Sequence, residues 1–424
     1  MRPSPDIPIA SRISFPPRPT IGIRPADLLR SVYVVGKTGT GKSALLLRLL
    51  LGAAERGFGG CLVDPTGDLA RQALAHLPRG VWNRIVSFRP ADGERSVGLN
   101  LFRVGSGSSR ALVASAAVEA FRALWGQTLF GPRSEHLLRN AALALLETPD
   151  PTVLGLLRIL VDAGARDALI ERLTDPVVRT FWAKEFPALG RPFAAEVTAP
   201  LLNKLGALSA PAVRRALGQV RPKLDMREAL DAGRIVVADL SGIGRDGAQL
   251  LGAFLVSAVD IAARSRAGSP ESERRPFILV ADEFHGYVTE SFLTLLAEGR
   301  KFGVCAALAH QHAAQLPPAI RSAAIGNVGT LVAFALGGED AQLLASEFWP
   351  DADARELARL PRYRIALRLL VDGEPARPEV CDTLPPPPWC EVPETLLRIS
   401  AERYARPTAE VDRQIRAALG TLAS

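Results

Sequence analysis

Eight residues near the start of the chain carry the clearest chemical pattern. Residues 36–43 fit the spacing G-x-x-x-x-G-K-S/T. In such a loop the glycines let backbone N–H groups wrap around phosphate, and Lys42 adds positive charge beside the β- and γ-phosphates. The alternative is a glycine-rich turn that binds nothing. We predict a nucleoside triphosphate site, with Mg²⁺ ligated by Ser43, formed by Gly36, Lys37, Thr38, Gly39, Thr40, Gly41, Lys42 and Ser43.

Two adjacent carboxylates follow an apolar run much later in the chain. Residues 277–281 are all apolar, and Asp282 and Glu283 come directly after them. This pattern indicates a central strand that ends at the nucleotide, where Asp282 would hold Mg²⁺ and Glu283 would orient and deprotonate the attacking water. Acidic residues at the end of a buried strand are common, so the prediction depends on the phosphate loop upstream.

A third polar group follows the next apolar run, residues 304–309. Gln311 could sense the γ-phosphate or hold the attacking water, whereas the alternative is a solvated strand end. His310 and His312 flank it and invite a metal site, but no paired carboxylate motif accompanies them. We expect His285, beside Glu283, to line the site or its loop rather than to act as a base.

The elements that would position these residues alternate between strands and helices. Helical patterns separate most of the strand-like runs, which predicts an α/β fold with a doubly wound, mainly parallel sheet. The apolar run before the phosphate loop reads as a strand, and residues 44–50 read as a helix. The strand-like runs are residues 32–35, 60–63, 84–88, 234–240, 277–281, 304–309 and 328–335.

A long helical stretch interrupts this alternation. Between residues 105 and 232 the apolar spacing follows a period of 3.6, with prolines between the pieces, which predicts an inserted all-helical subdomain. We expect the nucleotide-binding domain to comprise residues 20–104 and 233–383. Residues 1–19 would be a proline-rich lead, and residues 384–424 would form a proline spacer and a C-terminal helical tail.

Composition limits the possible locations and partners. The chain has 424 residues, a net charge of +7 and a pI of about 9.6, which permits nucleic-acid binding without proving it. Its four cysteines have no metal-ligand spacing and read as free thiols in a reducing compartment. The first 19 residues contain no apolar signal core, and no run reaches 18 uncharged apolar residues. We therefore expect a cytoplasmic protein with no direct membrane span.

Taken together, these segments resemble the HerA/FtsK superfamily of P-loop ATPases. The nearest resemblance is to the TraG/TraD-type coupling ATPases of conjugation and type IV secretion. It extends over about residues 20–383 and implies a RecA-like core with a helical insertion, a homohexamer around a central channel, and ATP hydrolysis coupled to DNA movement. The matching segments are residues 34–47, 62–69, 97–100, 200–204, 277–284, 298–311 and 325–330.

The resemblance also implies roles for single residues. Lys42 and Ser43 match the nucleotide-binding loop, and Asp282 and Glu283 match the magnesium ligand and the base. Gln311 matches the sensor glutamine. Arg300 matches the arginine that reaches into the neighbouring subunit's site, although it could instead be a cation at a helix C-terminus. Asp64 ends the second strand, where it could polarise the water or cap the strand.

Some features typical of the relatives are not recognisable in the sequence. Coupling proteins usually begin with transmembrane helices, HerA proteins with a β-barrel, and FtsK-type pumps carry a winged-helix DNA reader. We therefore expect DNA to be bound with low sequence specificity and to be presented by a relaxase, nuclease or secretion-machinery partner.

These observations predict an Mg²⁺-dependent ATPase that works as a hexameric DNA translocase in a conjugation-like or mobile-element system. One alternative is a HerA-type helicase motor that processes DNA ends with a nuclease. Another is an ATP-switched assembly scaffold that pumps no DNA. A small-molecule kinase is disfavoured, because Glu283 and Gln311 suit water activation.

Overall fold

The computed structural model describes residues 6–13, 18–105, 107–129 and 131–420. Its centre is a sheet of 11 strands in the order β2-β1-β14-β11-β10-β3-β9-β8-β4-β7-β5. The seven strand-like runs of the sequence form the seven strands from β10 to β5, and all of these run parallel. They are β3 (Val32–Val35), β4 (Gly59–Asp64), β5 (Ile85–Phe88), β7 (Ile235–Asp239), β8 (Phe277–Ala281), β9 (Val304–His310) and β10 (Thr330–Ala333).

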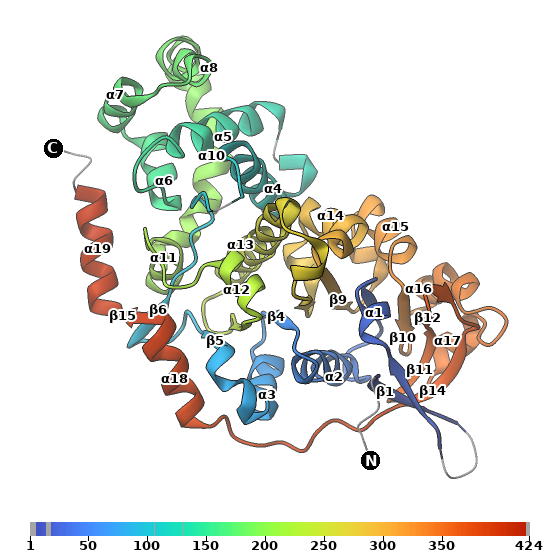
Figure 1. The fold of residues 1–424 in the computed structure, drawn as a ribbon. Helices are drawn as coiled ribbons and strands as arrows, with labels where there is room; N and C mark the ends of the chain where they lie inside the picture. The colour runs from blue at the N-terminus through green and yellow to red at the C-terminus, as the bar shows by residue number, and fades with distance from the viewer. Residues whose placement is uncertain (1–5, 14–17, 106, 130, 421–424) are drawn as a thin grey trace.

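Helices cover both faces of the parallel strands (Figure 1). Alternate side chains of a strand point to opposite faces, so Val32 and Val34 enter one apolar core while Tyr33 and Val35 enter the other. This two-sided burial explains why the parallel strands read as continuous apolar runs. Helices α2 (Lys42–Glu55) and α3 (Asp68–His76) cover one face, and the helices on the other include α12 (Met226–Ala232), α13 (Arg245–Arg264), α14 (Glu290–Glu298) and α15 (Pro318–Gly326).

Four antiparallel strands extend the sheet beyond β10. They are β11 (Arg364–Arg368), β14 (Glu379–Thr383), β1 (Ile7–Arg12) and β2 (Thr20–Ile23). Strand β1 lies within residues 1–19, which the sequence led us to expect as a lead outside the domain. Its Ile7 and Ile9 are fully buried. A Cβ on Gly52 of α2 would lie 2.5 Å from the Ile7 side chain, so the glycine lets this strand pack closely on the helix.

Between β6 (Arg95–Val97) and β7, the described residues form helices and turns. This helical region lies at the top of Figure 1, and its helix α4 (Arg110–Leu129) runs along α13 of the core. The Asn100 side chain ties the two ends of the region together, because its Nδ2 donates to the carbonyls of Pro151 at 2.9 Å and Val220 at 3.0 Å. The main helices are α4 (Arg110–Leu129), α5 (Pro132–Leu145), α6 (Val153–Val161), α7 (Ala163–Arg172), α8 (Pro176–Thr180), α10 (Arg191–Leu205) and α11 (Pro211–Leu217).

The C-terminal segment crosses the lower side of the core and returns to the helical region (Figure 1). Helix α18 (Glu394–Tyr404) packs on the edge strand β5, where the Ser87 amide donates to the Ser400 hydroxyl at 2.8 Å. Strand β15 (Ala405–Pro407) pairs with β6. Helix α19 (Thr408–Gly420) then reaches α11 through the ion pair between Arg215 and Asp412 at 2.7 Å. This tail covers an otherwise open sheet edge.

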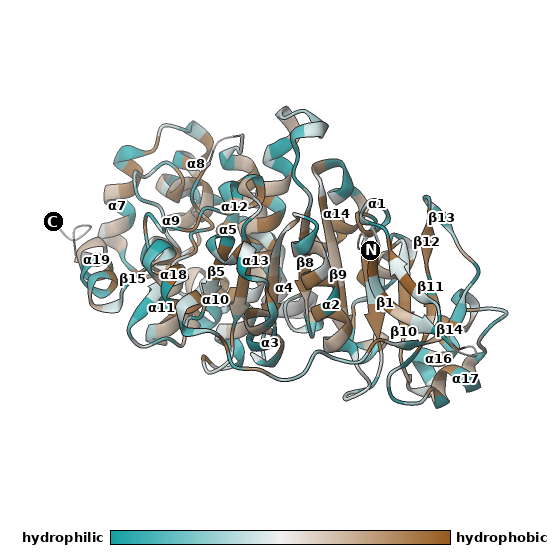
Figure 2. Cartoon of the chain, turned by 60° about the horizontal axis from the view of Figure 1, so that its bottom comes forward, coloured by the Kyte–Doolittle hydropathy of each residue, from teal (hydrophilic) through white to brown (hydrophobic). Residues whose placement is uncertain are grey.

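The long helix α13 is the apolar centre of the molecule. Among the described residues, Arg245–Gly268 is the one helix with the length and composition to cross a membrane, and 89% of its most apolar window is buried inside the fold. Figure 2 shows that apolar residues lie at the centre of the fold. Central strands such as β9 are coloured hydrophobic, and the outer helices carry hydrophilic residues.

Candidate active site

Three neighbouring strands bring the expected site residues together. Strand β9 lies between β3 and β8, and all three run parallel. Their carboxyl ends therefore meet at one edge of the sheet, which is where α/β folds bind ligands. The phosphate loop follows β3, Gln311 follows β9, and Asp282 and Glu283 follow β8.

The loop after β3 adopts a conformation that its glycines make possible. Gly41 has φ +124°, and a Cβ there would lie 2.9 Å from the ring of Tyr363. A Cβ on Gly36 would lie 2.5 Å from the Cβ of Phe334. Across the described chain, the amides of Thr38, Gly39 and Gly41 make no backbone hydrogen bond. These N–H groups and the N-terminus of α2 form a cradle for phosphate.

Lys42 is held inside this loop. Its Nζ donates to the carbonyls of Gly36 at 2.7 Å and Lys37 at 3.0 Å, and the side chain is buried. Burial lowers the pKa of Lys42, while the nearby Glu283 and Asp282 carboxylates raise it. The Lys42 ammonium therefore lies inside the loop. If the loop binds phosphates, their oxygens would take the place of the Gly36 and Lys37 carbonyls as its hydrogen-bond acceptors.

Ser43 and Asp282 form a pair of oxygen ligands suited to Mg²⁺. The Ser43 hydroxyl donates to Oδ2 of Asp282 at 2.9 Å. Asp282 is 6% exposed, and burial raises its pKa to about 6. The raised pKa means that the surrounding groups do not compensate the ionised carboxylate for its loss of water. A divalent cation at this point would stabilise the ionised form.

Glu283 lies between two polar side chains. Its backbone has φ +47°, an uncommon conformation for a residue other than glycine. Its Oε1 accepts a hydrogen bond from Nε2 of Gln311 at 2.8 Å, and its Oε2 lies 3.4 Å from Nδ1 of His285. The strained backbone thus turns the carboxylate towards the amide at the tip of the neighbouring strand.

A cavity of about 340 Å³ adjoins Glu283 on the side of α13. His285 lines it together with Arg245 and Gln249 of α13, as we expected for His285. Burial lowers the pKa of His285, so the imidazole is neutral at pH 7. Oε2 of Glu283 and Nδ1 of His285 are both buried, and at 3.4 Å they approach each other without a hydrogen bond.

The two other histidines of this region lie in different surroundings. His310 is fully buried, and its Nε2 lies 2.5 Å from the Tyr33 hydroxyl. Burial lowers the pKa of His310 to about 3. His312 instead faces Asp340, with Nδ1 at 3.6 Å from Oδ2. The described residues contain no group of three His, Cys, Asp or Glu side chains that could hold a metal ion.

Asp64 is engaged in local hydrogen bonds. Its Oδ1 accepts from the amide and hydroxyl of Thr66 at 2.9 and 2.7 Å, and its Oδ2 accepts from the Ala70 amide at 2.9 Å. These bonds close the turn after β4 and cap α3. Both carboxylate oxygens are thus engaged in hydrogen bonds just after β4, and a role of Asp64 in polarising the water stays a prediction.

Arg300 lies at the opposite edge of the sheet. It belongs to η7 (Gly299–Phe302), the 3-10 turn that precedes β9, whereas Gln311 follows that strand. Seven strand residues separate the two positions, which corresponds to about 20 Å and exceeds the reach of an arginine side chain. Arg300 is exposed, and within the described chain its side chain makes no hydrogen bond or ion pair.

Several residues of the site were not found from the sequence. Tyr363 packs over Gly41, and its amide donates to the Thr40 carbonyl at 3.0 Å, but it lies more than 300 positions away and in no recognisable motif. The position of Arg245 in the site, by contrast, could have been predicted from the sequence. It opens a long helix directly after a glycine-containing turn at the end of β7, which is the context of a ligand-facing loop.

The sheet order and the phosphate loop define the RecA-like P-loop NTPase fold. The family model described as "Type IV secretion-system coupling protein DNA-binding domain" matches residues 19–324. The chain therefore belongs to this family, which confirms the resemblance to coupling ATPases of the TraG/TraD type. No protein in the curated sequence collection matches the chain.

Solved structures support the same fold. The bacterial conjugative coupling protein TrwBdeltaN70 is 18% identical, with a TM-score of 0.62 over 86% of this chain and 87% of that one. The same figures hold for the plasmid coupling protein TrwB in complex with ADP and Mg²⁺. VirB4 of Thermoanaerobacter pseudethanolicus is 16% identical, with a TM-score of 0.59 over 91% of this chain and 97% of that one.

Proposed function

We propose that this protein is an Mg²⁺-dependent ATPase that translocates DNA as the coupling motor of a conjugation-like or mobile-element system. One observation carries the catalytic part of this proposal. The hydrogen bond between Gln311 and Glu283 at 2.8 Å joins a base and a water-positioning amide beside the phosphate loop. The DNA part rests on the family, whose description names a DNA-binding domain.

Each residue of the site has a chemical role in this proposal. Glu283 accepts the proton of the attacking water, and Gln311 holds the carboxylate and the water in line with the γ-phosphate. Lys42 leaves the loop carbonyls and binds the β- and γ-phosphates. Mg²⁺, held by Ser43 and Asp282, would neutralise charge that develops on the phosphate oxygens.

The position of Arg300 supports a ring. The residue cannot reach the nucleotide of its own subunit, because it lies at the amino end of β9 and the site lies at the carboxyl end. In the homohexamer that we propose, Arg300 enters the neighbour's site and stabilises the charge of the transition state. It would then be a catalytic residue supplied in trans.

The partner and the location also belong to this proposal. DNA would be bound through its backbone, and a relaxase or a component of the secretion machinery would present it. All four cysteines are free thiols, and three of them are buried, which is typical of proteins in the reducing cytoplasm.

The test compares the ATP hydrolysis rate with and without duplex and single-stranded DNA. We expect DNA to raise the rate of the wild type several-fold and to have no effect on Glu283→Gln. A rate that DNA leaves unchanged, in a protein that hydrolyses ATP, would refute the motor and support the ATP-switched scaffold.

A further inference from the structure

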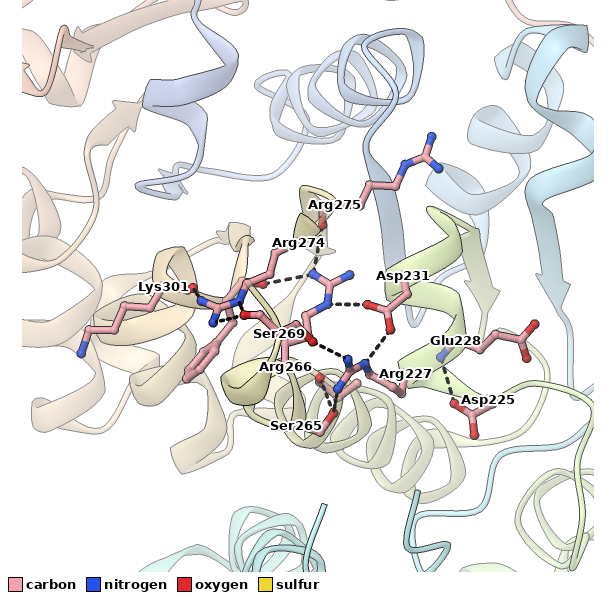
Figure 3. A network of polar contacts seen from close by, with 12 residues as sticks. Asp225, Arg227, Glu228, Asp231, Ser265, Arg266, Ser269, Arg274, Arg275 and Lys301 are labelled. Carbon is pink, nitrogen blue, oxygen red and sulfur yellow. Dashed lines mark hydrogen bonds and ion pairs between the residues drawn. The ribbon is translucent and has the colours of Figure 1, made fainter. Parts of the chain in front are cut away.

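Two other arginines, the fully buried Arg266 and the half-buried Arg274, donate hydrogen bonds to the turn that carries Arg300. The turn η7 exposes Arg300 and Lys301, while two of its backbone carbonyls accept these bonds. The carbonyl of Phe302 accepts a hydrogen bond from Nη1 of Arg266 at 3.0 Å. The carbonyl of Lys301 accepts one from Nη1 of Arg274. Figure 3 shows the Arg274 guanidinium beside Lys301, with Arg266 on the far side of Arg274.

Arg266 connects four parts of the fold. It follows α13 in the chain, its Nε donates to Asp231 of α12 at 2.9 Å, and its Nη1 also donates to the carbonyl of Arg275 at 3.0 Å, just before β8. With the bond to Phe302, one planar guanidinium fixes η7 relative to α12, α13 and β8 (Figure 3). A lysine could not satisfy these partners, because its ammonium is a single point on a flexible stem.

The guanidinium of Arg266 joins an exposed carboxylate to the interior. Arg266 is fully buried, and burial lowers its pKa, whereas the side chain of its partner Asp231 is 47% exposed. What the arginine adds is a fixed geometry between its partners, and one of these partners is the turn that bears Arg300.

The second arginine reinforces the same turn. Arg274 also donates to the carbonyl of Ser269, with Nε at 3.0 Å, and its guanidinium lies over the Phe302 ring at 5.9 Å. Gly303, directly after η7, has φ +72°, and a Cβ there would lie 3.2 Å from the carbonyl of Arg274. The backbone at Gly303 and the backbone at Arg274 are therefore packed closely against each other and have little room to shift.

We propose that Arg266, with help from Arg274, is a positioning residue for Arg300. It sets the place and direction from which Arg300 reaches the neighbouring subunit's nucleotide, and it touches neither nucleotide itself. This inference rests on the proposed role of Arg300 in trans. It adds that the arginine is preorganised by a hydrogen-bond network centred on the buried Arg266 of its own subunit.

The test uses mixed oligomers in which one subunit supplies the arginine and another supplies the site. Acceptor subunits carry Arg300→Ala and keep an intact nucleotide site. Donor subunits carry Glu283→Gln, which stops their own site but leaves Arg300 in place. Hydrolysis in the mixture then measures how well the donors present Arg300, provided that co-assembly is shown by native mass spectrometry.

We expect Arg266→Met in the donor to lower this trans activity by between about 10-fold and 100-fold, because a misplacement of about 1 Å can cost about 10²-fold in rate. Arg266→Lys should give a smaller loss. The matched control is Arg227→Met in the donor. Arg227 belongs to the same network, but its bonds go to Asp231, Ser265 and Ser269 (Figure 3), so trans activity should be retained.

A second arrangement separates positioning from a general loss of structure. With Arg266→Met placed in the acceptor, where Arg300 is already absent, activity with unmodified donors should remain unchanged. A purely structural role would lower activity in both arrangements. If Arg266→Met subunits fail to assemble, Arg274→Met in the donor decides the question, since Arg274 is partly exposed and bonds the same turn.

Two results would overturn the inference in distinguishable ways. If Arg266→Met and Arg274→Met donors are as active as the Arg227→Met donor, the positioning role is wrong, while the trans role of Arg300 stands. If unmodified donors fail to activate acceptors in demonstrated mixed oligomers, Arg300 does not act in trans, and the positioning role falls with it.

Discussion

Replacing Asp282 with asparagine should make the nucleotide-free protein more stable at pH 8 while it abolishes hydrolysis. Burial raises the pKa of Asp282 from 3.8 to about 6. A carboxyl whose pKa is raised on folding contributes stability that is present below its unfolded pKa and is lost as the pH rises through the folded one. The wild type therefore loses about 3 kcal/mol from this group between strongly acidic pH and pH 8, about 2 kcal/mol of it above pH 4.5, since one pKa unit corresponds to about 1.4 kcal/mol.

Asparagine removes this penalty but gives up one acceptor. Asp282 accepts hydrogen bonds from the Ser43 hydroxyl and from the Glu283 amide, and an asparagine can accept only one of them with its oxygen. The lost bond costs about 1 kcal/mol at all pH values. We therefore expect almost equal stability at pH 4.5 and a gain of about 2 kcal/mol for Asp282→Asn at pH 8.

The assay is the melting temperature in EDTA from pH 4.5 to pH 8. The difference between Asp282→Asn and wild type should grow with pH, and ADP with Mg²⁺ should reverse it, because the wild type binds this ligand better. Asp239→Asn is the matched control, since this carboxylate ends β7, two strands away from β8 in the sheet, and already accepts hydrogen bonds from the Ser241 amide and hydroxyl. A difference independent of pH, or a less stable Asp282→Asn protein at pH 8, would refute the reasoning.

Three further predictions concern catalysis and DNA. Lys42→Ala should abolish hydrolysis and weaken nucleotide binding without lowering the melting temperature, and unchanged turnover would exclude this loop as the site. Glu283→Gln should bind ATP but slow hydrolysis by about 10²–10⁴-fold, whereas Asp64→Asn should lower stability and spare hydrolysis. The opposite pattern would place the base on β4. DNA affinity should fall steeply with salt and show little sequence preference, and a flat salt dependence in binding titrations would contradict backbone tracking.

The sequence predicted the parallel half of the sheet because those strands are buried on both faces. Their side chains are apolar without interruption, as in β8 (Phe277–Ala281), so each strand is visible as a run. The antiparallel strands lack this signal. Strands β11 and β14 carry charges that pair across the sheet, such as Arg364 with Asp382 at 2.8 Å, and β1 contains a proline. Such strands are defined by their neighbours rather than by their own pattern.

The candidate site was predictable to the extent that its chemistry lies in consecutive residues. The phosphate loop, the acidic pair and Gln311 each follow a recognisable strand, and parallel strand ends meet at one edge. The approach of Tyr363 to Gly41, and the network around Arg266, join segments that are far apart in the chain. Contacts of this kind leave no local period or spacing, so the three-dimensional structure was needed to find them.

Translocation itself is the central claim, and an ATP-dependent displacement assay tests it most directly. The assay follows release of a triplex-forming strand from duplex DNA, and of streptavidin from a biotinylated single strand. We predict that the wild-type protein with ATP and Mg²⁺ displaces at least one of these blocks, and that Glu283→Gln and Arg300→Ala displace neither. If a wild-type preparation that hydrolyses ATP and binds DNA clears neither block, this protein is not a DNA motor.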